Sequence, residues 1–376
     1  AGNGDHQGFG RVGGDGVMIQ LKDLCQKASS NIAQKDLEGH EGQYPIYGAS
    51  GLIGYVDFYK QENPYVAVVK DGAGIGRVMC LPEKSSVIGT MQYILPNEGV
   101  NVHYLAFAME HMNLAKYFSG ATIPHIYFKD YCTERLPKNS EAEQKQISTT
   151  LSRVTELISL RKQQLSKLDE LIKARFVEMF GDPVSNPFNW LTAELGNRCE
   201  IITGNTPSRA EPENYGTFIE WIKSDNINTP STFLTEAQER LSEIGFQKCR
   251  FVESGSLLMT CIAGSLNCIG NVAVANRRVA FNQQINAITP THDNVLYLYW
   301  LMILSKPTIH RTINMALKGI LSKSQLSLIK FPFPPLPLQN QFAAFVERVD
   351  QQKQTVQQSL EKLELMKKAL MQEYFG

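Results

Sequence analysis

The chain has 376 residues, of which 43% are hydrophobic, and this is enough for two or three domains with apolar cores. Its formal net charge of zero gives no support to nucleic-acid binding from bulk charge alone. No run of about 18 apolar residues occurs, so no membrane span is predicted. The seven cysteines include no C-x-x-C pair, which predicts reduced thiols in a cytoplasmic protein and no metal site.

The first part of the chain is predicted to be a tail followed by an α+β domain. Residues 1–17 contain seven glycines and are expected to be a disordered tail or the remnant of a tag, with Met18 as a natural start. In residues 18–139, YPIYGASGLIGYVDFY (44–59) and PYVAVVKDGAGIGRVMCLP (64–82) combine aromatic and β-branched residues with glycine turns, which predicts strands. A helix is predicted over 102–118.

A long helix is predicted over 140–181, because residues 141–180 contain neither proline nor glycine. Ser140 followed by Glu143 is the signature of a capping box at its start. Gly181 and Pro183 end it.

The second part of the chain repeats this order. Residues 182–336 are predicted to form another α+β domain, with strands in 218–228 and 255–275 and a helix in 295–306. A second long helix is predicted over 337–376, with Pro337 in its first turn, where a missing N–H costs nothing.

The two long helices are copies of one sequence. When residues 141–181 are aligned with 336–376 without a gap, 13 of the 41 positions are identical, including the final Phe-Gly of each helix. Similarity extends upstream, where NVHYLAFAM (101–109) matches NVLYLYWLM (294–302). The chain is therefore predicted to be two homologous halves related by a pseudo-twofold axis.

Apolar residues recur along both helices at alternating steps of four and three, which is the heptad pattern of a coiled coil. We predict one intramolecular antiparallel coiled coil that separates the two domains; a helical hairpin packed on a core is the alternative. The predicted seam consists of Ile147, Leu151, Val154, Ile158, Leu165, Leu168, Ile172, Phe342, Val346, Val349, Val356, Leu360, Leu363 and Leu370.

Charged seam positions favour pairing between the two helices rather than self-pairing. Arg161 and Arg175 correspond to Val356 and Leu370, whereas Lys353 and Lys367 correspond to Ile158 and Ile172. Pairing one copy with the other avoids stacking like charges and lets the long stems lie over apolar neighbours.

Motifs for catalysis are weak. GAGIGRV (72–78) lacks the spacing of a phosphate-binding loop, and a tight turn between strands is the simpler interpretation. The tripeptide at 63–65, Asn-Pro-Tyr, matches only part of the N-P-P-Y motif of adenine methyltransferases. Polar clusters in TGNTPSR (203–209), KSDNINT (223–229) and FNQQIN (281–286) carry side chains that read base edges, although the same residues also serve turns.

Taken together, the duplicated plan and several stretches resemble the specificity (S) subunit of a Type I restriction–modification enzyme. The stretches are YPIYGASGLIGYVDFY, KDGAGIGRV, TGNTPSR with EWIKSDNIN, and PLPLQNQFAAFVERVDQQ, and the resemblance runs from Met18 to Gly376. It implies an α+β chain of two homologous target recognition domains separated by two conserved helices.

The resemblance also implies function and partners. Each recognition domain would read one half of a split sequence in double-stranded DNA, and the helices would set the unread gap. Two methyltransferase subunits would bring S-adenosylmethionine, and motor-nuclease subunits would bring ATP and Mg. This chain itself would bind no cofactor and do no chemistry.

Candidate DNA contacts follow from the resemblance. In the first domain they are Ser50, Lys70, Arg77, His125 and Lys129. In the second domain they are Thr206, Ser208, Arg209, Lys223, Asn226, Gln283 and Lys323. The cations would mostly hold phosphates, and the amides and hydroxyls would more often face bases. The first domain departs from the pattern, because GTMQYILP lacks the Asn282-Gln283 pair of the second domain.

Two other functions stay open at this point. One is the recognition fragment of a single-chain restriction-methyltransferase, which a methylation assay on the chain alone would reveal. The other is a coiled-coil scaffold without a nucleic-acid role, which failure to bind DNA selectively would favour.

Overall fold

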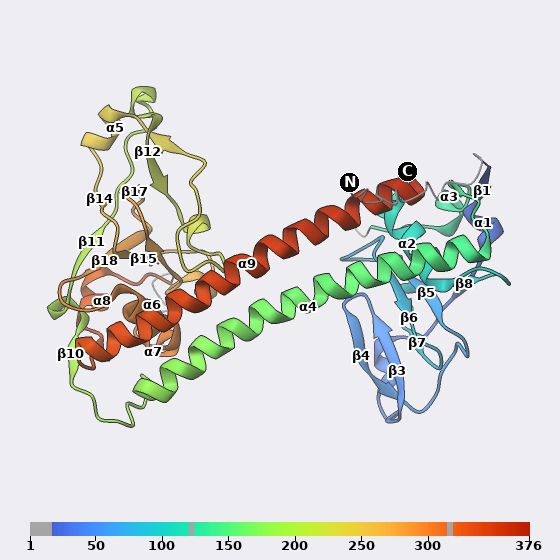
Figure 1. Ribbon diagram of the computed structural model, residues 1–376, viewed down its shortest axis with the longest axis horizontal. Coiled ribbons are helices and arrows are strands. Elements are labelled where there is room, and N and C mark those ends of the chain that lie inside the picture. The colour runs from blue at the N-terminus through green and yellow to red at the C-terminus, as the bar shows by residue number, and fades with distance from the viewer. Residues whose placement is uncertain (1–16, 120–123, 314–318) are drawn as a thin grey trace, which may run out of the picture. The chain divides into compact units, whose positions relative to one another are not determined.

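The computed structural model describes residues 17–119, 124–313 and 319–376, and these divide into two compact units (Figure 1). Unit 1 comprises the chain up to Gln163 together with Gln357–Gly376, and unit 2 comprises Gln164–Val356. Apart from Val17, the predicted tail 1–17 lies outside the described residues. Each unit holds one mixed α/β domain and part of both long helices.

Unit 1 is built on a four-stranded antiparallel sheet in the order β2-β8-β5-β6. A second sheet has the order β4-β3-β7, in which β3 and β7 are parallel, and β1 pairs with β9. The elements are β1 (Met18–Gln20), α1 (Leu21–Leu24), β2 (Cys25–Ser29), η1 (Gln34–Leu37), β3 (Tyr44–Gly48), β4 (Gly51–Val56), β5 (Tyr65–Val69), β6 (Val78–Leu81), β7 (Ser86–Val87), β8 (Met91–Pro96), α2 (Val102–His111), η2 (Leu114–Tyr117), α3 (Phe128–Tyr131) and β9 (Arg135–Pro137).

Unit 2 repeats this topology with one more strand, β14, at the edge of its second sheet. Its main sheet has the order β11-β18-β15-β16, its second sheet has the order β13-β12-β17-β14, and β10 pairs with β19. The elements are β10 (Thr192–Glu194), η3 (Leu195–Asn197), β11 (Cys199–Thr203), η4 (Pro212–Asn214), β12 (Tyr215–Ile222), η5 (Ser224–Asn226), β13 (Arg240–Leu241), α5 (Glu243–Gln247), β14 (Phe251–Val252), β15 (Ser256–Thr260), η6 (Leu266–Cys268), β16 (Val272–Ala275), β17 (Val279–Phe281), β18 (Ile285–Pro290), α6 (Val295–Leu304), α7 (Lys306–Arg311), α8 (Lys323–Leu328) and β19 (Lys330–Pro332). The predicted α+β class and the duplication are thereby confirmed.

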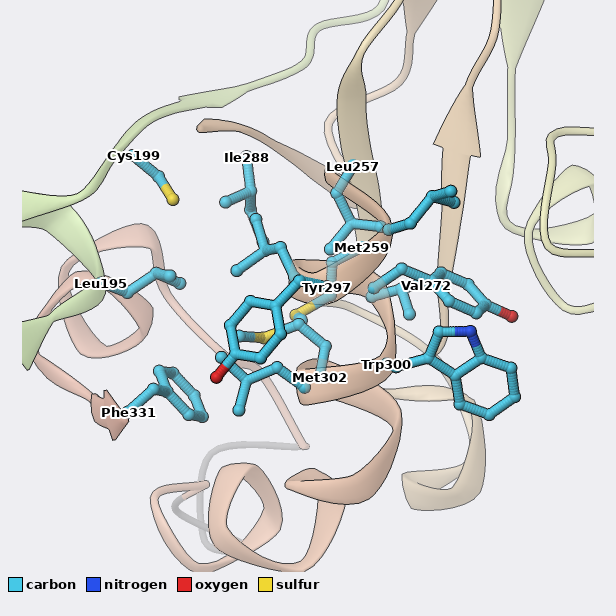
Figure 2. Packing of buried hydrophobic residues seen from close by; sticks show 14 of the residues in the cluster. Leu195, Cys199, Leu257, Met259, Val272, Ile288, Tyr297, Trp300, Met302 and Phe331 are labelled. Carbon is cyan, nitrogen blue, oxygen red and sulfur yellow. The ribbon is translucent and has the colours of Figure 1, made fainter. Parts of the chain in front are cut away.

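In each domain one face of the main sheet packs against a helix, and the opposite face carries a separate buried cluster. In unit 2 that helix is α6, and Figure 2 shows its Tyr297 among Met259, Ile288 and Phe331. The central strands β5 and β15 are buried along their whole length, which explains why they are continuous apolar runs rather than alternating ones.

The glycine-rich stretch 72–78 connects β5 to β6, so the predicted turn between strands is confirmed. Gly72, Gly74 and Gly76 all have positive φ angles, which glycine adopts without steric cost. A Cβ on Gly76 would lie 2.5 Å from the backbone nitrogen of Ala115, so only glycine fits there.

The single helix predicted over 102–118 is wrong beyond α2. The helix ends because Asn113 takes a left-handed conformation, with φ of 51°, and the chain continues as η2. Asparagine tolerates this conformation better than most residues, but an asparagine does not by itself end a helix. The sequence alone therefore did not predict the break. The helix predicted over 295–306 is present as α6.

The two long helices are α4 (Glu141–Phe180) and α9 (Leu336–Phe375). The predicted capping box is confirmed, because the Glu143 carboxylate accepts from the Ser140 N–H at 2.7 Å and the Ser140 hydroxyl accepts from the Glu143 N–H at 3.4 Å. Gly181 follows α4 with a φ of 78°, and Pro337 lies in the first turn of α9.

In unit 1 the start of α4 packs against the end of α9. Met371 and Phe375 share a buried cluster with Ile147 and Leu151. Further along, Lys162 lies 2.9 Å from Glu364. In this unit the helices run antiparallel.

In unit 2 the end of α4 packs against the start of α9. Phe176 contacts Phe342 edge-on with ring centroids 5.4 Å apart, and Lys353 donates to Asp169 at 2.7 Å. The pairing is antiparallel here too, and the predicted fold class is confirmed.

The structure places every predicted seam residue in a buried or half-buried position. Of the charged seam positions, Arg161 donates to Ser359 at 3.3 Å and Arg175 lies over the ring of Phe345. Lys367 reaches Glu110 at 2.8 Å and lies over the Phe107 ring. These long stems cover apolar surface while their charged heads find partners.

Candidate nucleic-acid interface

In unit 1, two of the predicted contacts meet at the β3–β4 turn. Ser50 is exposed in that turn, and Arg77, in the β5–β6 loop, donates from Nη1 to the neighbouring Ala49 carbonyl at 2.7 Å. This hydrogen bond holds the guanidinium beside Ser50 on the surface.

The other three predicted contacts of unit 1 gather around Asp71, at the end of β5. Lys70 forms an ion pair with one carboxylate oxygen, and His125 Nδ1 lies 2.6 Å from the other. Tyr127 stacks on the His125 ring, and Lys129 Nζ lies 5.4 Å from the centroid of the Tyr127 ring. Lys70, Asp71, His125, Tyr127 and Lys129 are called the Asp71 cluster below.

The ionisation of Asp71 is set by its neighbours. Burial opposes the charged form, but hydrogen bonds from Lys70 and His125 outweigh it, so the pKa of Asp71 is lowered. The carboxylate is therefore negatively charged at neutral pH and holds the Lys70 ammonium.

In unit 2, Arg209 and Lys223 gather around Glu239. Arg209 Nη1 lies 2.8 Å from Oε1 of Glu239, its Nη2 lies 3.2 Å from Oε2, and Lys223 pairs with Oε2. The guanidinium of Arg209 lies over the rings of Tyr215 and Trp221, 5.0 and 5.6 Å from their centroids, and Lys223 also lies over Trp221. These five residues are called the Glu239 cluster.

The pKa of Glu239 is lowered by the hydrogen bond from Arg209, with burial opposing it and Lys223 adding to it. Trp221, Lys223 and Glu239 also line an open hollow of about 410 Å³. Its other walls include Asp225, Thr235, Glu236 and Gln238, so the hollow offers several carboxylate and amide groups.

Thr206 and Gln283 meet across the loops that follow β11 and precede β18. The Thr206 hydroxyl donates to Oε1 of Gln283, and both side chains are exposed. Ser208 is exposed nearby in sequence and its carbonyl accepts from Asn214 at 3.0 Å. Lys323 is exposed at the first residue of α8, and the structure does not bring it into the Glu239 cluster.

Asn226 differs from the other predicted contacts, because it is only 8% exposed. Its Oδ1 accepts from the Lys223 N–H at 3.0 Å and its Nδ2 donates to the Glu236 carbonyl at 3.2 Å. Both ends of the amide thus stabilise the turn that presents Lys223.

Five residues of the clusters were not predicted from the sequence: Asp71, Tyr127, Tyr215, Trp221 and Glu239. Asp71 and Trp221 could have been noticed, since they lie one and two residues from the predicted cations Lys70 and Lys223. Glu239 could not, because 30 residues separate it from Arg209.

Among the residues that the structure describes, no group of three or more His, Cys, Asp or Glu side chains could hold a metal ion. In the same part of the chain, no helix is both long and apolar enough to cross a membrane. The Asn-Pro-Tyr tripeptide leads into β5, and its Tyr65 is fully buried. The Tyr65 side chain is therefore part of the core and not of a surface site.

Comparison with known proteins decides the family. A model of the Type I restriction modification DNA specificity domain matches residues 15–170 and again residues 187–365. The chain belongs to this family. The two matches fall one on each copy of the repeat, and the predicted resemblance to a Type I specificity subunit is confirmed.

Curated specificity subunits match different lengths of the chain. That of the type I restriction enzyme HindI from Haemophilus influenzae is 30% identical over 109 residues, which are 28% of this chain and 23% of that protein. The putative specificity subunit of the type I restriction enzyme MjaX from Methanocaldococcus jannaschii is 22% identical over 411 aligned positions, covering 96% of this chain and 93% of that protein.

The fold is shared with a solved specificity subunit. The S subunit of the Type I restriction–modification system of M. genitalium superimposes with a TM-score of 0.65 at 16% identity, over 96% of both chains. The pattern of two α/β domains and two long helices is therefore common to this chain and that subunit.

Proposed function

We propose that this specificity subunit reads a bipartite sequence in double-stranded DNA, one half with each recognition domain, and that the helix pair sets the unread gap. The observation that carries the proposal is that each copy of one fold displays its own cluster of cations on surface loops. Lysine and arginine suit phosphates, and exposed amides and hydroxyls such as Gln283 and Thr206 suit base edges.

The two domains differ where they would have to differ. The equivalent strands β8 and β18 begin at Met91 and Ile285, and the residue two positions before each is Gly89 in unit 1 and Gln283 in unit 2. A glycine offers a base no side chain, whereas a glutamine can hydrogen-bond to adenine. Different half-sequences for the two domains follow from such differences.

We further infer that the chemistry belongs to partner subunits. Two methyltransferase subunits would supply S-adenosylmethionine and methylate adenine, and motor-nuclease subunits using ATP and Mg would cleave. The exposed leucines on the long helices support a protein partner, since Leu157 and Leu160 of α4 are 45% and 50% exposed outside the seam.

Methylation mapping tests this function. Genomic DNA from cells that carry this chain and the methyltransferase subunit encoded with it should contain methylated adenines in one split motif with a constant gap. Cells that carry the methyltransferase alone are the control. The proposal would be overturned if this chain alone methylated DNA. It would also be overturned if no methylation depended on the presence of this chain.

A further inference from the structure

The Asp71 and Glu239 clusters share one arrangement although the two domains place it in different loops. In each cluster a single carboxylate bridges two predicted DNA contacts: Asp71 holds Lys70 and His125, and Glu239 holds Arg209 and Lys223. The Lys70, Arg209 and Lys223 cations that should attract phosphates are therefore already paired with an anion of the chain itself.

The exposure of these groups shows what DNA would meet. The Glu239 side chain is 26% exposed, whereas those of Arg209 and Lys223 are 60% and 36% exposed. In unit 1, the Asp71 side chain is 24% exposed and that of His125 is 38% exposed. In the Glu239 cluster the carboxylate lies deeper than both of its cations, whereas in the Asp71 cluster it is about as exposed as Lys70, at 27%, and less exposed than His125. A ligand therefore meets basic groups at both sites and must compete with the carboxylate for them.

We propose that Asp71 and Glu239 are specificity-determining residues that compete with DNA phosphates for these basic groups. The inference rests on the proposed DNA-reading function and deepens it. On a non-target sequence, phosphates must share the cations with a nearby negative charge, which weakens binding. On the target, the released carboxylate accepts a hydrogen bond from a base amino group, such as that of cytosine, and the loss is offset.

The arrangement also suits a chain of zero net charge. Non-specific DNA binding depends on how many phosphates a protein neutralises, and each contact contributes about 0.9 to the slope of log affinity against log salt. Cations neutralised internally add little to that slope, so a neutral chain with masked cations binds random DNA weakly and keeps its selectivity.

The test compares Glu239→Gln and Asp71→Asn with the wild-type full chain in complex with its methyltransferase subunit. Fluorescence anisotropy measures affinity for a duplex carrying the mapped target and for a scrambled duplex, over a series of KCl concentrations. For Glu239→Gln we expect scrambled-duplex affinity to rise roughly threefold to tenfold, since two exposed ion pairs are lost. Its salt slope should steepen by up to about 1.8, and that of Asp71→Asn by about 0.9. Target affinity should not rise in step.

Matched controls separate local masking from bulk charge. Glu253→Gln breaks the exposed Arg278–Glu253 pair, and Asp57→Asn breaks the exposed His40–Asp57 pair, with the same change in net charge. Neither control involves a predicted contact, so both should leave the slope within error of wild type.

The outcomes are distinct. If Glu239→Gln and Asp71→Asn leave the scrambled-duplex affinity unchanged, or if the controls shift it equally, the masking proposal is wrong while selective binding by the wild type keeps the proposed function. If the wild-type complex shows no preference for any duplex, both proposals fall. Circular dichroism checks folding, and Glu239→Asp, which keeps the charge but shortens its reach, should show a smaller shift in the same direction.

Discussion

Two glutamines at equivalent positions of the repeat fasten each long helix to its own domain. In unit 1, Gln144 accepts from the Asn101 N–H at 3.0 Å and donates to the Asn139 carbonyl at 3.0 Å. In unit 2, Gln339 accepts from the Asn294 N–H at 2.9 Å and is fully buried. Because buried polar groups are costly to leave unpaired, both residues fix where the helix meets the domain.

The hydrogen bonds of Gln339 in unit 2 are stronger than those of Gln144 in unit 1. Gln339 also donates to Asp293 at 2.7 Å, and this fully buried carboxylate receives two more hydrogen bonds from Arg198 at 2.7 and 2.9 Å. No charged group takes part in the hydrogen bonds of Gln144. Replacing Gln339 leaves a buried carboxylate without one of its donors, whereas replacing Gln144 leaves only uncharged groups unpaired.

Gln339→Leu should therefore destabilise unit 2 by about 2–4 kcal/mol, and Gln144→Leu should destabilise unit 1 by about 1–3 kcal/mol. All three tryptophans, Trp190, Trp221 and Trp300, lie in unit 2, so fluorescence follows urea unfolding of that unit alone. The fluorescence midpoint should fall with Gln339→Leu and stay unchanged with Gln144→Leu. Equal fluorescence shifts in the two variants would contradict the view that each glutamine stabilises only its own unit.

Glu220 makes the stability of unit 2 dependent on pH. Its carboxylate receives hydrogen bonds from Arg277 Nε and Nη2, each at 2.7 Å, and from the Ala237 N–H at 2.8 Å. The hydrogen bonds from Arg277 hold the pKa of Glu220 below its usual range, although burial opposes them. A lowered pKa stabilises the fold above the unfolded value of about 4.3 and stops doing so as the pH falls through the folded value.

Glu220→Gln should thus cost about 1–3 kcal/mol at neutral pH, because the Arg277 guanidinium loses its charged partner. The difference from wild type should shrink as the pH falls below about 4. Urea unfolding followed by tryptophan fluorescence at several pH values measures it. A difference that does not vary with pH would show that Glu220 contributes through packing alone.

At the scale of elements, the long helices behave as a coiled coil in their middles and as globular helices at their ends. Phe176 and Phe180 of α4 are buried against Tyr297 and Phe342, and the equivalent Met371 and Phe375 of α9 are buried in unit 1. The heptad pattern passes through Arg175 instead of Phe176, so the sequence prediction missed this turn. At the ends of the long helices the side chains also pack on a domain, so the apolar face is wider there than a coiled-coil seam.

The exposed leucines of α4 lie on another face of the same helix. Leu157→Lys together with Leu160→Lys should leave the thermal unfolding midpoint nearly unchanged, because neither side chain is buried. The proposed methyltransferase subunit should no longer co-purify, since two charges would enter an apolar interface. Ser166→Lys is the control, because this exposed residue lies half a turn away from Leu157.

A pull-down of the methyltransferase subunit at equal concentrations reads out the result. Retained binding by the double variant would move the interface away from this face of α4. Lost binding by Ser166→Lys as well would show a general charge effect instead.

At the scale of the whole chain, the duplication was readable from the sequence because it lies in local patterns: a capping box, a heptad seam and repeated Phe-Gly endings. The predicted contacts Lys70, Arg77, Arg209 and Lys223 came from the family resemblance, and the structure places all four in loops. The sequence did not show which distant segments pair. Examples are the ion pair of Arg209 with Glu239 and the contacts of Lys70 and His125 with Asp71. Such pairs depend on how loops meet after the sheets have formed, and no spacing rule encodes them.

The central claim is a division of labour, in which the domains read and the helices space. It is tested most directly by inserting one heptad into both helices, after Gln163 and after Val356, where the two units meet along the chain. Seven residues add about 10 Å and two full turns of a coiled coil, so the helix faces stay in register.

Methylation mapping of cells that carry this variant and its methyltransferase then gives the answer. We predict that both half-motifs persist unchanged while the gap between them lengthens, by about three base pairs if the helices set it directly. Altered half-motifs at a constant gap would contradict the account, because the helices would then take part in reading and the domains alone would not define the sequence.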